Sequence, residues 1–257
     1  MKKGAQKTEE TIFFDSLPEA FCGFKIAHIS DIHSRPASNA AKVVKAEKPD
    51  IIVITGDILD SRFNGTKETE ALILELLAVA PLYFVTGNHD VWSAENEEEL
   101  KKYGALGAHN MDGRFEKIEK NGAEIGIFGV GDSGDKNPKK ISAHIKKEFS
   151  QLPEYNGFKL LLFHRANHFD EIKDLGYDLV LSGHMHGGQV VIGRLGGVLS
   201  PSSALFSGKR IFFPKYSLGT HKWGKTTMKI NRGMGNTLPI PRWNNPAEIG
   251  IITLMRL

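Results

Sequence analysis

The sequence predicts an α/β fold in a single domain, and three features of the chain support this prediction. First, 257 residues with 40% hydrophobic and 25% charged side chains describe an ordinary globular protein that can bury a core. Second, short hydrophobic runs alternate with longer segments of helical period, which is the pattern of strands joined by crossover helices. Third, no segment after Gly187 has a helical period and glycine is more frequent there, so the last part of the chain is expected to be mainly β.

Six hydrophobic runs in the first part of the chain predict strands. Their density of β-branched and aromatic residues suits strands that are buried on both faces of a sheet. The Asn121-Gly122 pair is typical of a hairpin turn, so one antiparallel pair, 115–118 with 125–128, interrupts the crossover pattern. The predicted strands cover residues 24–29, 51–54, 82–85, 125–130, 160–163 and 179–181.

Five segments between these runs predict helices. In the second of them, Leu72, Leu76 and Val79 have the spacing that keeps one helical face apolar. The predicted helices cover residues 38–47, 67–79, 94–103, 138–149 and 167–175.

The last part of the chain predicts a second, mainly antiparallel sheet, because only short β-like runs occur there, at 190–192, 210–213, 226–230 and 250–254. No linker precedes it, so we expect one domain over residues 1–257. Its parts are an N-terminal segment (1–23), an α/β part with the candidate ligands (24–186), and a Gly-rich, basic, mainly β part that completes the second sheet (187–257).

Composition narrows the class of protein further. A single cysteine, Cys22, cannot form an intramolecular disulfide and is compatible with a reducing compartment. The N-terminus lacks the apolar stretch of a secretory signal, and the longest apolar run, 76–85, contains Pro81 and is half the ~20 residues that span a membrane. We therefore expect a cytoplasmic protein, membrane-associated or exported only if an anchor lies outside this chain.

Charge is unevenly distributed along the chain. The net charge is only +3, yet residues 201–257 hold nine Lys or Arg and one acid, Glu248. Solvated edge strands protected by lysines explain this bias, and a rim that attracts an anionic substrate is the alternative. A nucleic-acid binder is disfavoured because no groove-reading helix is recognisable.

Five predicted strands end in groups that can bind a metal. Because the carboxyl ends of parallel strands meet in one crevice of an open α/β sheet, these groups are expected to meet in space. Each motif alone is weak: Gly-Asp and Gly-Asn-His-Asp also form turns, and a lone histidine is more typical of a hydrogen-bonded core residue. The groups in chain order are Asp31, His33, Asp57, Asn88, His89, Asp90, His164, His184 and His186.

Carboxylates, imidazoles and one amide, without a thiolate, suit manganese, iron or zinc. Seven candidate ligands exceed the four of a closed structural zinc site, so two divalent metal ions are implied and one carboxylate must bridge them. Such a pair clamps the attacking and leaving oxygens of an in-line phosphoryl displacement.

In this order, the motifs Asp-x-His, Gly-Asp, Gly-Asn-His-Asp, His and Gly-His-x-His resemble the calcineurin-like metallophosphoesterase superfamily, over residues 25–186. The segments 186–189, 232–235 and 241–249 are similar to its bacterial YkuE-like phosphodiesterase branch. The resemblance implies a four-layer αββα sandwich with a dinuclear metal site on one edge.

The resemblance also implies roles for these residues. Attack by a metal-bridging hydroxide is expected. His89 would face the scissile phosphate as a catalytic residue that is not a ligand, and Asp90 would orient its ring. Ligands of the first metal would be Asp31, His33 and His186, those of the second Asn88, His164 and His184, and Asp57 would bind both.

Three neighbours of the ligands, Arg165, Asn167 and Gln189, are predicted to bind substrate, since a guanidinium matches phosphate geometry. Several phenylalanines are better explained by core strands than by a lipid-facing surface, although some related enzymes cleave lipid-linked pyrophosphates. They are Phe13, Phe14, Phe21, Phe24, Phe206, Phe212 and Phe213.

The expected function is metal-dependent hydrolysis of a phosphodiester or phosphoric anhydride. A UDP-2,3-diacylglucosamine-type pyrophosphatase is the alternative enzyme, and a catalytically inactive metal-binding or phosphate-binding module is the alternative of another class. The expected partner is a small phosphoester substrate, with a peripheral lipid substrate left open and with no specific nucleic acid. The sequence carries no signal for oligomeric state.

Overall fold

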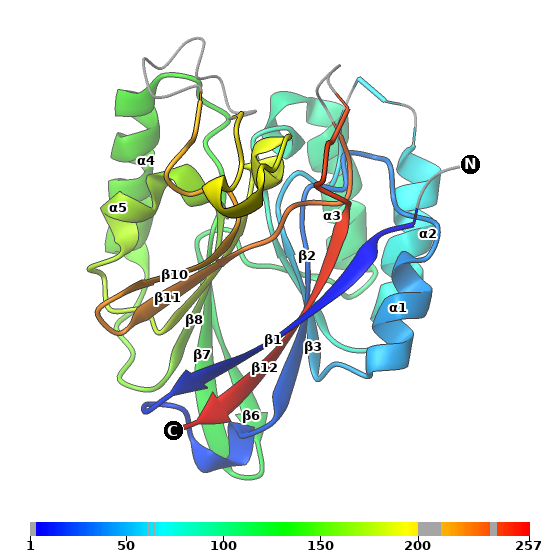
Figure 1. Cartoon of the computed structure of the whole chain (residues 1–257). Helices are drawn as coiled ribbons and strands as arrows, with labels where there is room; N and C mark the ends of the chain where they lie inside the picture. Colours follow the sequence, from blue (N-terminus) through cyan, green and yellow to red (C-terminus); the bar gives the residue numbers. More distant parts are fainter. Residues whose placement is uncertain (1–3, 61, 64, 200–211, 237–240) are drawn as a thin grey trace.

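Two six-stranded sheets form the centre of the molecule, and helices cover the outer face of each sheet (Figure 1). The structure is a computed structural model that describes residues 4–60, 62–63, 65–199, 212–236 and 241–257. Its layers confirm the predicted αββα sandwich. Helix α1 (Ala40–Glu47), α2 (Thr66–Leu77) and α3 (Ala94–Ala105) cover the first sheet, and α4 (Pro138–Gln151) and α5 (Phe169–Ile172) cover the second.

The first sheet has the strand order β1-β12-β2-β3-β4-β5. Strands β2 to β5 are parallel, β12 runs antiparallel to β2, and β1 pairs with β12 in parallel. The strands are β1 (Gln6–Phe14), β12 (Glu248–Arg256), β2 (Phe24–Ile29), β3 (Ile51–Thr55), β4 (Leu82–Val85) and β5 (His109–Asn110).

The second sheet has the order β10-β11-β9-β8-β7-β6. Its four central strands are parallel and its two edge strands are antiparallel, β6 through the predicted Asn121-Gly122 hairpin. The strands are β10 (Gly219–Trp223), β11 (Thr226–Ile230), β9 (Leu179–Gly183), β8 (Lys159–Arg165), β7 (Ala123–Val130) and β6 (Arg114–Lys120).

Alternating side chains of the central strands fill both interfaces. In β3, Ile52 and Ile54 pack against the helices, whereas Ile51 and Val53 pack in the core between the two sheets. All four are buried, which explains why the strand reads as a continuous hydrophobic run rather than an alternating one.

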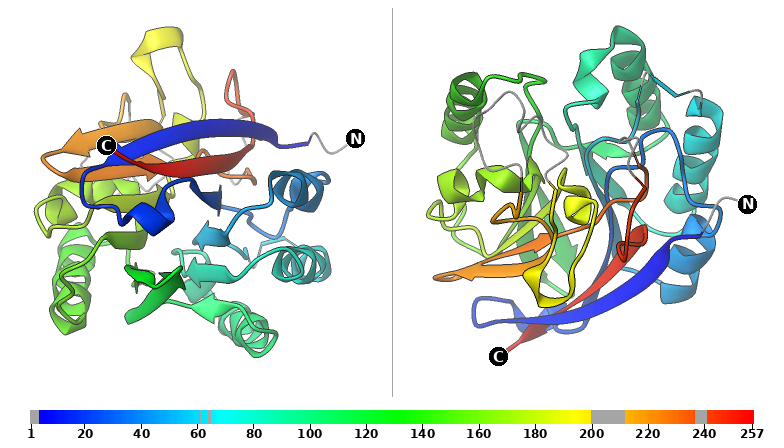
Figure 2. Two further views of the ribbon diagram at one scale, coloured as in Figure 1. Left: turned by 90° about the horizontal axis from the view of Figure 1, so that it is seen from below. Right: turned by 45° about the horizontal axis from the view of Figure 1, so that its top comes forward.

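The C-terminal part does not form one antiparallel sheet, which corrects the prediction. Strands β10 and β11 extend the second sheet, but β12 enters the first sheet between β1 and β2. The N-terminal segment, for which no strand was predicted, supplies β1, and both views in Figure 2 show it beside β12. The polar first half of β1 conceals the strand in the sequence, because only Ile12 and Phe14 of its nine residues are buried.

The predicted helix at 167–175 is shorter, because a 3-10 turn (Ala166–His168) precedes α5. In the run at 190–192, Val190 and Val191 form isolated bridges rather than a strand, and part of the run at 210–213 lies outside the described residues. Phe14, Phe21 and Phe24 lie in the core between the sheets, Phe13, Phe212 and Phe213 are exposed, and Phe206 lies outside the described residues. No helix in the described ranges is long and apolar enough to cross a membrane.

Candidate metal centre

Seven candidate ligands lie at the ends of five strands, at one edge of the two sheets. They follow β2, β3 and β4 in the first sheet and belong to or follow β8 and β9 in the second. All seven are buried, and short distances join the ring nitrogens and carboxylate oxygens of six of them, so the convergence predicted from the sequence is present for these six. The residues are Asp31, His33, Asp57, Asn88, His164, His184 and His186.

One group of potential ligands consists of Asp31, His33 and His186. The Nε2 atoms of the two histidines lie 3.1 Å apart, and Asp31 Oδ1 lies 3.4 Å from His186 Nε2 and 3.7 Å from His33 Nε2. The other oxygen of Asp31 accepts a hydrogen bond of 3.0 Å from the backbone N–H of His184. His184 belongs to the second group, described next, so the backbone of the second group positions a carboxylate of the first.

The adjacent group consists of Asp57, His164 and His184. Asp57 Oδ2 lies 3.3 Å from His164 Nε2, and His184 Nδ1 lies 3.2 Å from the same nitrogen. His164 Nδ1 donates to the carbonyl oxygen of Thr55 at 2.7 Å, which leaves Nε2 unprotonated and free to bind a metal in the neutral ring.

The residues present fit divalent cations. The amide oxygen of Asn88 is buried, and no described residue donates a hydrogen bond to it. Such an orphaned acceptor is costly unless an unseen partner satisfies it, and a cation is such a partner. Together with two carboxylates and four imidazoles, it makes a borderline-to-hard donor set.

Five of the seven ligand candidates have a left-handed backbone. This conformation is uncommon for residues other than glycine and is typical of functional sites, where the surrounding structure imposes it. The φ angles are 51° for Asp31, 51° for His33, 50° for Asp57, 71° for His184 and 47° for His186.

Gly183 allows the two sheets to approach at this edge. A Cβ atom there would lie 1.8 Å from Ser30 Oγ and 2.4 Å from Asp31 Oδ2. We expect Gly183→Ala to lower the thermal midpoint and the metal content together, because the added methyl group displaces a ligand carboxylate. Gly107→Ala is the stability control, since a Cβ at Gly107 meets nothing within 4 Å although its φ of +106° still strains the backbone. Unchanged metal content in Gly183→Ala would contradict this packing.

The two carboxylates are held in the ionised form. Burial acts to raise the pKa of Asp31, but His186 and His33 outweigh it and hold this pKa below its usual value. Burial opposes ionisation of Asp57 as well, and His164 and His33 keep its pKa well below the usual range. Both oxygen ligands are thus ready to bind a cation at neutral pH.

Two of the candidate ligand histidines, His33 and His164, hold protons in the metal-free protein. Burial acts to lower the pKa of His33, but Asp31 and Asp60 raise it to about 9. Burial also acts to lower the pKa of His164, but the larger effect of Asp57 raises it to about 10. A histidine must lose its extra proton before it can bind a cation. Metal binding at neutral pH is therefore expected to release these protons.

A pH dependence of stability follows for the metal-free protein. Because the folded pKa values of His33 and His164 exceed the ordinary 6.5, their stabilisation is full below 6.5 and is lost as pH rises through 9 and 10. We expect the thermal midpoint in EDTA to fall over this range and Mn²⁺ to restore it. His33→Asn should flatten the curve, and an unchanged slope in that variant would contradict the assignment.

Beside the two groups lies His89, whose ring contacts Asp60. The distance from Asp60 Oδ2 to His89 Nδ1 is 3.1 Å, which leaves Nε2 as the ring atom that can meet a substrate. The side chain of His89 remains 12% exposed, more than any of the seven ligand candidates. Its ring packs edge-on against His33 and at a tilt against Trp92, at 4.7 and 4.4 Å between centroids. By distance, one atom of His89 also groups with His33 and Asp57.

Asp90 does not make the contact with the His89 ring that was predicted for it. Instead of contacting the His89 ring, its carboxylate accepts backbone N–H bonds from Gly87, Ile58 and Leu59, at 2.8, 3.2 and 2.8 Å. Burial and the nearby Asp57 raise its pKa to about 7. Asp90 therefore ties the loop after β4 to the loop after β3, whereas Asp60 orients the histidine.

The comparison with protein families shows the family of the chain. The family model described as "Calcineurin-like phosphoesterase" matches residues 24–188, which contain all seven ligand candidates and His89. The chain belongs to the calcineurin-like phosphoesterase family. As a member it is a metal-binding hydrolase of phosphoric esters, and the resemblance seen in the sequence is confirmed.

Individual relatives agree with this membership. The uncharacterized metallophosphoesterase YkuE of Bacillus subtilis (strain 168) is 28% identical over 260 residues, covering 97% of this chain and 85% of that protein. Phosphodiesterase YaeI of Escherichia coli (strain K12) is 27% identical over 247 residues, covering 90% and 82%. The solved structure of TT1561 of Thermus thermophilus, at 14% identity, covers 82% of this chain and 90% of that one with a TM-score of 0.52, a likeness of fold alone.

The three residues of this phosphoesterase that were predicted to bind substrate differ in whether their polar atoms already have hydrogen-bond partners. The Arg165 guanidinium is buried and pairs with Asp132, at 2.5 and 2.9 Å, so it is committed to a neighbouring carboxylate. Asn167 has a buried amide oxygen that accepts no hydrogen bond from a described residue. Gln189 is buried and donates to the amide oxygen of Asn236 at 3.0 Å.

Two further residues of the phosphoesterase site were not singled out in the sequence. Asp60 follows Asp57 by three residues on the same loop, and this spacing was the available signal. Arg242 donates from Nη2 toward His186 Nδ1 at 3.0 Å and also to the carbonyl oxygen of Gly235. No local pattern marks it, because the C-terminal segment reaches the site only in the folded chain.

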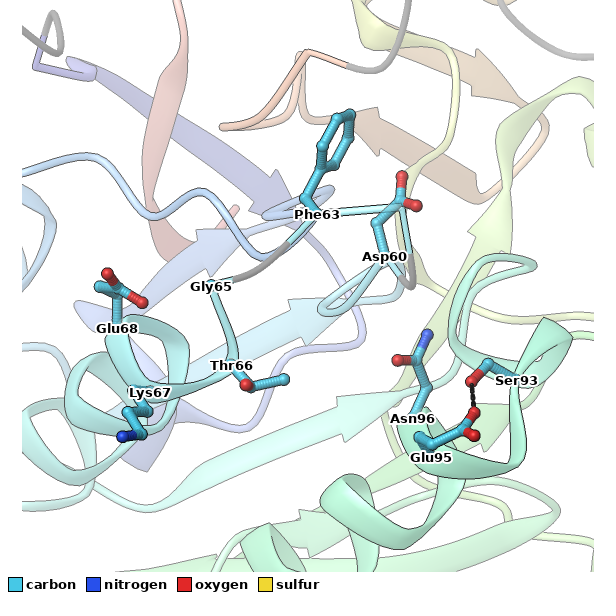
Figure 3. Close-up of a pocket in the computed structure, with 9 residues that line it drawn as sticks. All are labelled: Asp60, Phe63, Gly65, Thr66, Lys67, Glu68, Ser93, Glu95 and Asn96. Atoms are coloured by element: carbon cyan, nitrogen blue, oxygen red, sulfur yellow. Dashed lines mark hydrogen bonds between the residues drawn. The ribbon is translucent and has the colours of Figure 1, made fainter.

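A cavity of about 510 Å³ borders the Asp60 side of the site (Figure 3). It lies between the first turns of α2 and α3, and Asp60 and Phe63 line the end nearest the metal centre. Asn96, on its other side, donates to the backbone carbonyl of His89 at 3.0 Å. The remaining lining residues are Gly65, Thr66, Lys67, Glu68, Ser93 and Glu95.

Proposed function

We propose that this chain hydrolyses a phosphodiester or a phosphoric anhydride at a centre that holds two divalent cations. The observation that carries the proposal is the position of Asp57 between the two ligand groups. Its Oδ2 atom lies 3.6 Å from His33 Nε2 and 3.3 Å from His164 Nε2, so one carboxylate oxygen faces both groups. This supports Asp57 as the bridging ligand that a two-metal site requires.

The ligands divide around this carboxylate. Asp31, His33 and His186 would hold one cation, and Asn88, His164 and His184 the other. When bound, a cation pair supplies Lewis-acid stabilisation of phosphoryl oxygens and lowers the pKa of a water molecule toward ~7. The buried carboxylates of the chain neutralise only part of the cation charge, so the pocket favours an anionic phosphate.

His89 would protonate the leaving oxygen or stabilise negative charge on the phosphate. The Asp60 contact uses Nδ1 as donor, so Nε2 is the ring atom left for a substrate, and the Asn96 hydrogen bond fixes the backbone carbonyl of the same residue. Both contacts hold His89 in one orientation before substrate arrives, which is the geometric requirement of a general acid. Asp60 acts here as a positioning residue.

A diester substrate is supported by the relative named phosphodiesterase YaeI, which covers 90% of this chain. The test is a screen of the Mn²⁺-loaded protein against phosphomonoesters, bis(p-nitrophenyl) phosphate and nucleotide sugars, including UDP-2,3-diacylglucosamine. We expect turnover of the diester above that of the monoester p-nitrophenyl phosphate. Preference for the nucleotide sugar would assign the pyrophosphatase instead, and tight metal binding without turnover of any phosphoester would contradict the proposal.

A further inference from the structure

The cavity of about 510 Å³ in Figure 3 lies between two chain segments that each follow a residue of the proposed reaction. One wall is formed by the start of α2 and the loop before it, which follows the proposed bridging ligand Asp57. The other wall is formed by the start of α3, which follows His89. Pockets of this size hold small organic groups, so the cavity can take part of a substrate whose phosphate lies at the metal centre.

Two lining residues of the cavity contact His89 directly. Asp60 Oδ2 lies 3.1 Å from His89 Nδ1, and Asn96 donates to the backbone carbonyl of His89 at 3.0 Å. A general acid lies next to the oxygen that leaves phosphorus, so the rest of the leaving alcohol extends over the groups around His89. These contacts put the cavity on the side of the site where the alcohol leaves.

Phe63 gives the cavity an apolar wall at the end nearest the metal centre. The Arg35 guanidinium lies 3.4 Å from the centroid of this ring, and the cation–π contact holds the ring in place. Arg35 follows the candidate ligand His33 by two residues, so the wall is tied through the chain to the metal centre. The carbon skeleton of an organic alcohol can pack against such a ring.

The remaining lining of the cavity is rich in hydrogen-bond acceptors. It includes the carboxylates of Glu68 and Glu95 and the hydroxyls of Thr66 and Ser93. Ser93 donates to Glu95 at 2.5 Å, whereas Glu68 is exposed and makes no hydrogen bond or ion pair with a described residue. Because ionised carboxylates only accept hydrogen bonds, they favour a bound group with O–H donors, and such charge-assisted bonds are strong.

The charges of the lining disfavour a leaving group that carries a phosphate of its own. Asp60, Glu68 and Glu95 are acidic, and Lys67 is the one basic residue among the described residues that line the cavity. A phosphate repels these carboxylates and offers them no donor at neutral pH. Arg62 pairs with Asp60 at 2.6 Å, and Lys67 is adjacent to Glu68 in sequence, so the excess of negative charge is too small to select an ammonium group.

We infer that this cavity binds the leaving group of the substrate, and that the leaving group is a neutral alcohol with further hydroxyl groups, such as glycerol or a sugar. The inference rests on the proposed function and narrows it to a phosphodiester. In the reaction the oxygen of water bonds to phosphorus and the P–O bond to the alcohol breaks. The leaving oxygen takes a proton from His89, which a proton of the water restores.

The test compares kcat/KM of the Mn²⁺-loaded chain for four symmetrical diesters, followed by phosphorus NMR, so that either ester bond releases the same alcohol. Bis(glyceryl) phosphate is matched by dipropyl phosphate, which has the same carbon chains without free hydroxyl groups. Bis(glucos-6-yl) phosphate offers a sugar, and bis(3-phosphoglyceryl) phosphate offers a leaving group with a phosphate. We expect the glyceryl or the glucosyl diester to exceed both the dipropyl and the phosphoglyceryl diester by about tenfold or more.

Glu68→Ala removes an acceptor from the wall of the cavity. It should lower the preference for bis(glyceryl) phosphate over dipropyl phosphate by about tenfold, which corresponds to the loss of one hydrogen bond to a charged group. Glu75→Ala is the matched control, because Glu75 is also an exposed glutamate of α2 but does not line the cavity. The control should keep the preference of the unmodified chain.

Turnover of bis(p-nitrophenyl) phosphate separates the pocket from the reaction. If the unmodified chain hydrolyses this diester but treats the glyceryl and glucosyl diesters no better than dipropyl phosphate, the inference is overturned and the proposed function stands. A preference for the phosphoglyceryl diester, or a Glu68→Ala variant that discriminates as the control does, would overturn it too. A chain that hydrolyses none of the five diesters would contradict the proposed function and, with it, the assignment of the pocket.

Discussion

Replacing Asp57 with asparagine is expected to lower turnover of bis(p-nitrophenyl) phosphate by roughly a thousandfold or more and to lower bound metal as well. An amide at this position removes the negative oxygen that faces both His33 and His164. Loss of a bridging ligand takes away several kcal/mol of transition-state stabilisation, and each ~1.4 kcal/mol is tenfold in rate. Steady-state kinetics and metal analysis of the purified variant measure the two effects.

Asp112→Asn is the matched control for Asp57→Asn. Asp112 is also a carboxyl at this end of the sheets, half-buried, and burial raises its pKa to about 6. It accepts a backbone N–H bond from Thr86, which an asparagine oxygen can also accept. We expect this control to keep its metal and most of its turnover. Equal metal content in the two variants would remove Asp57 from the ligand set.

Replacing His89 with alanine is expected to lower turnover by about 10²- to 10⁴-fold while leaving the metal content unchanged. The histidine contacts Asp60 and the ring of His33, and one of its ring atoms lies near His33 and Asp57, but its partial exposure places it at the mouth of the site. The expected separation of turnover from metal binding distinguishes a catalytic residue from a ligand. Retained activity with lost metal would reverse the assignment.

Asp60→Asn tests how His89 is positioned. An asparagine keeps the shape of the side chain but weakens the contact with His89 Nδ1, so turnover should fall less than in His89→Ala and metal content should stay constant. The split between kcat and KM gives an independent readout, because a general acid that is no longer held in place lowers kcat and leaves KM nearly unchanged. A lower thermal midpoint with unchanged kcat would show that Asp60 has only a structural role.

The sequence predicted the metal centre because its ligands follow buried parallel strands. Hydrophobic runs such as 51–54 mark the strands, and the carboxyl ends of parallel strands converge by topology alone. The residues in between have no influence on this argument, so ligands 155 positions apart, Asp31 and His186, could be placed together. The structure joins six of the seven candidates by short distances and buries all seven.

Contacts between side chains could not be predicted in the same way. Asp90 is adjacent to His89 in sequence, yet consecutive side chains point apart, and the folded loops place Asp60 beside the ring instead. Arg165 was predicted to bind substrate because its ion-pair partner could not be recognised in the sequence. That partner, Asp132, lies 33 residues earlier, after β7. Arg242 reaches His186 only because the segment between β11 and β12 returns to the site. These partners depend on loop paths, which carry no periodic signal.

The division of the C-terminal strands between the two sheets was unpredictable for a related reason. Strands β11 and β12 have similar hydrophobic runs, and nothing in either run states which sheet edge it joins. The choice is made by pairing partners far away in the sequence, β9 for β11 and β1 with β2 for β12. Strand composition predicts that a strand forms, and only long-range register assigns its neighbour.

The most direct test of the dinuclear centre is anomalous X-ray diffraction from crystals of the full chain grown with Mn²⁺. We predict two anomalous peaks about 3.5–4 Å apart, with Asp57 contacting both and with Asp31 and His164 each contacting one. A single peak, or peaks away from these side chains in a protein that is active with manganese, would contradict a two-metal phosphoesterase site.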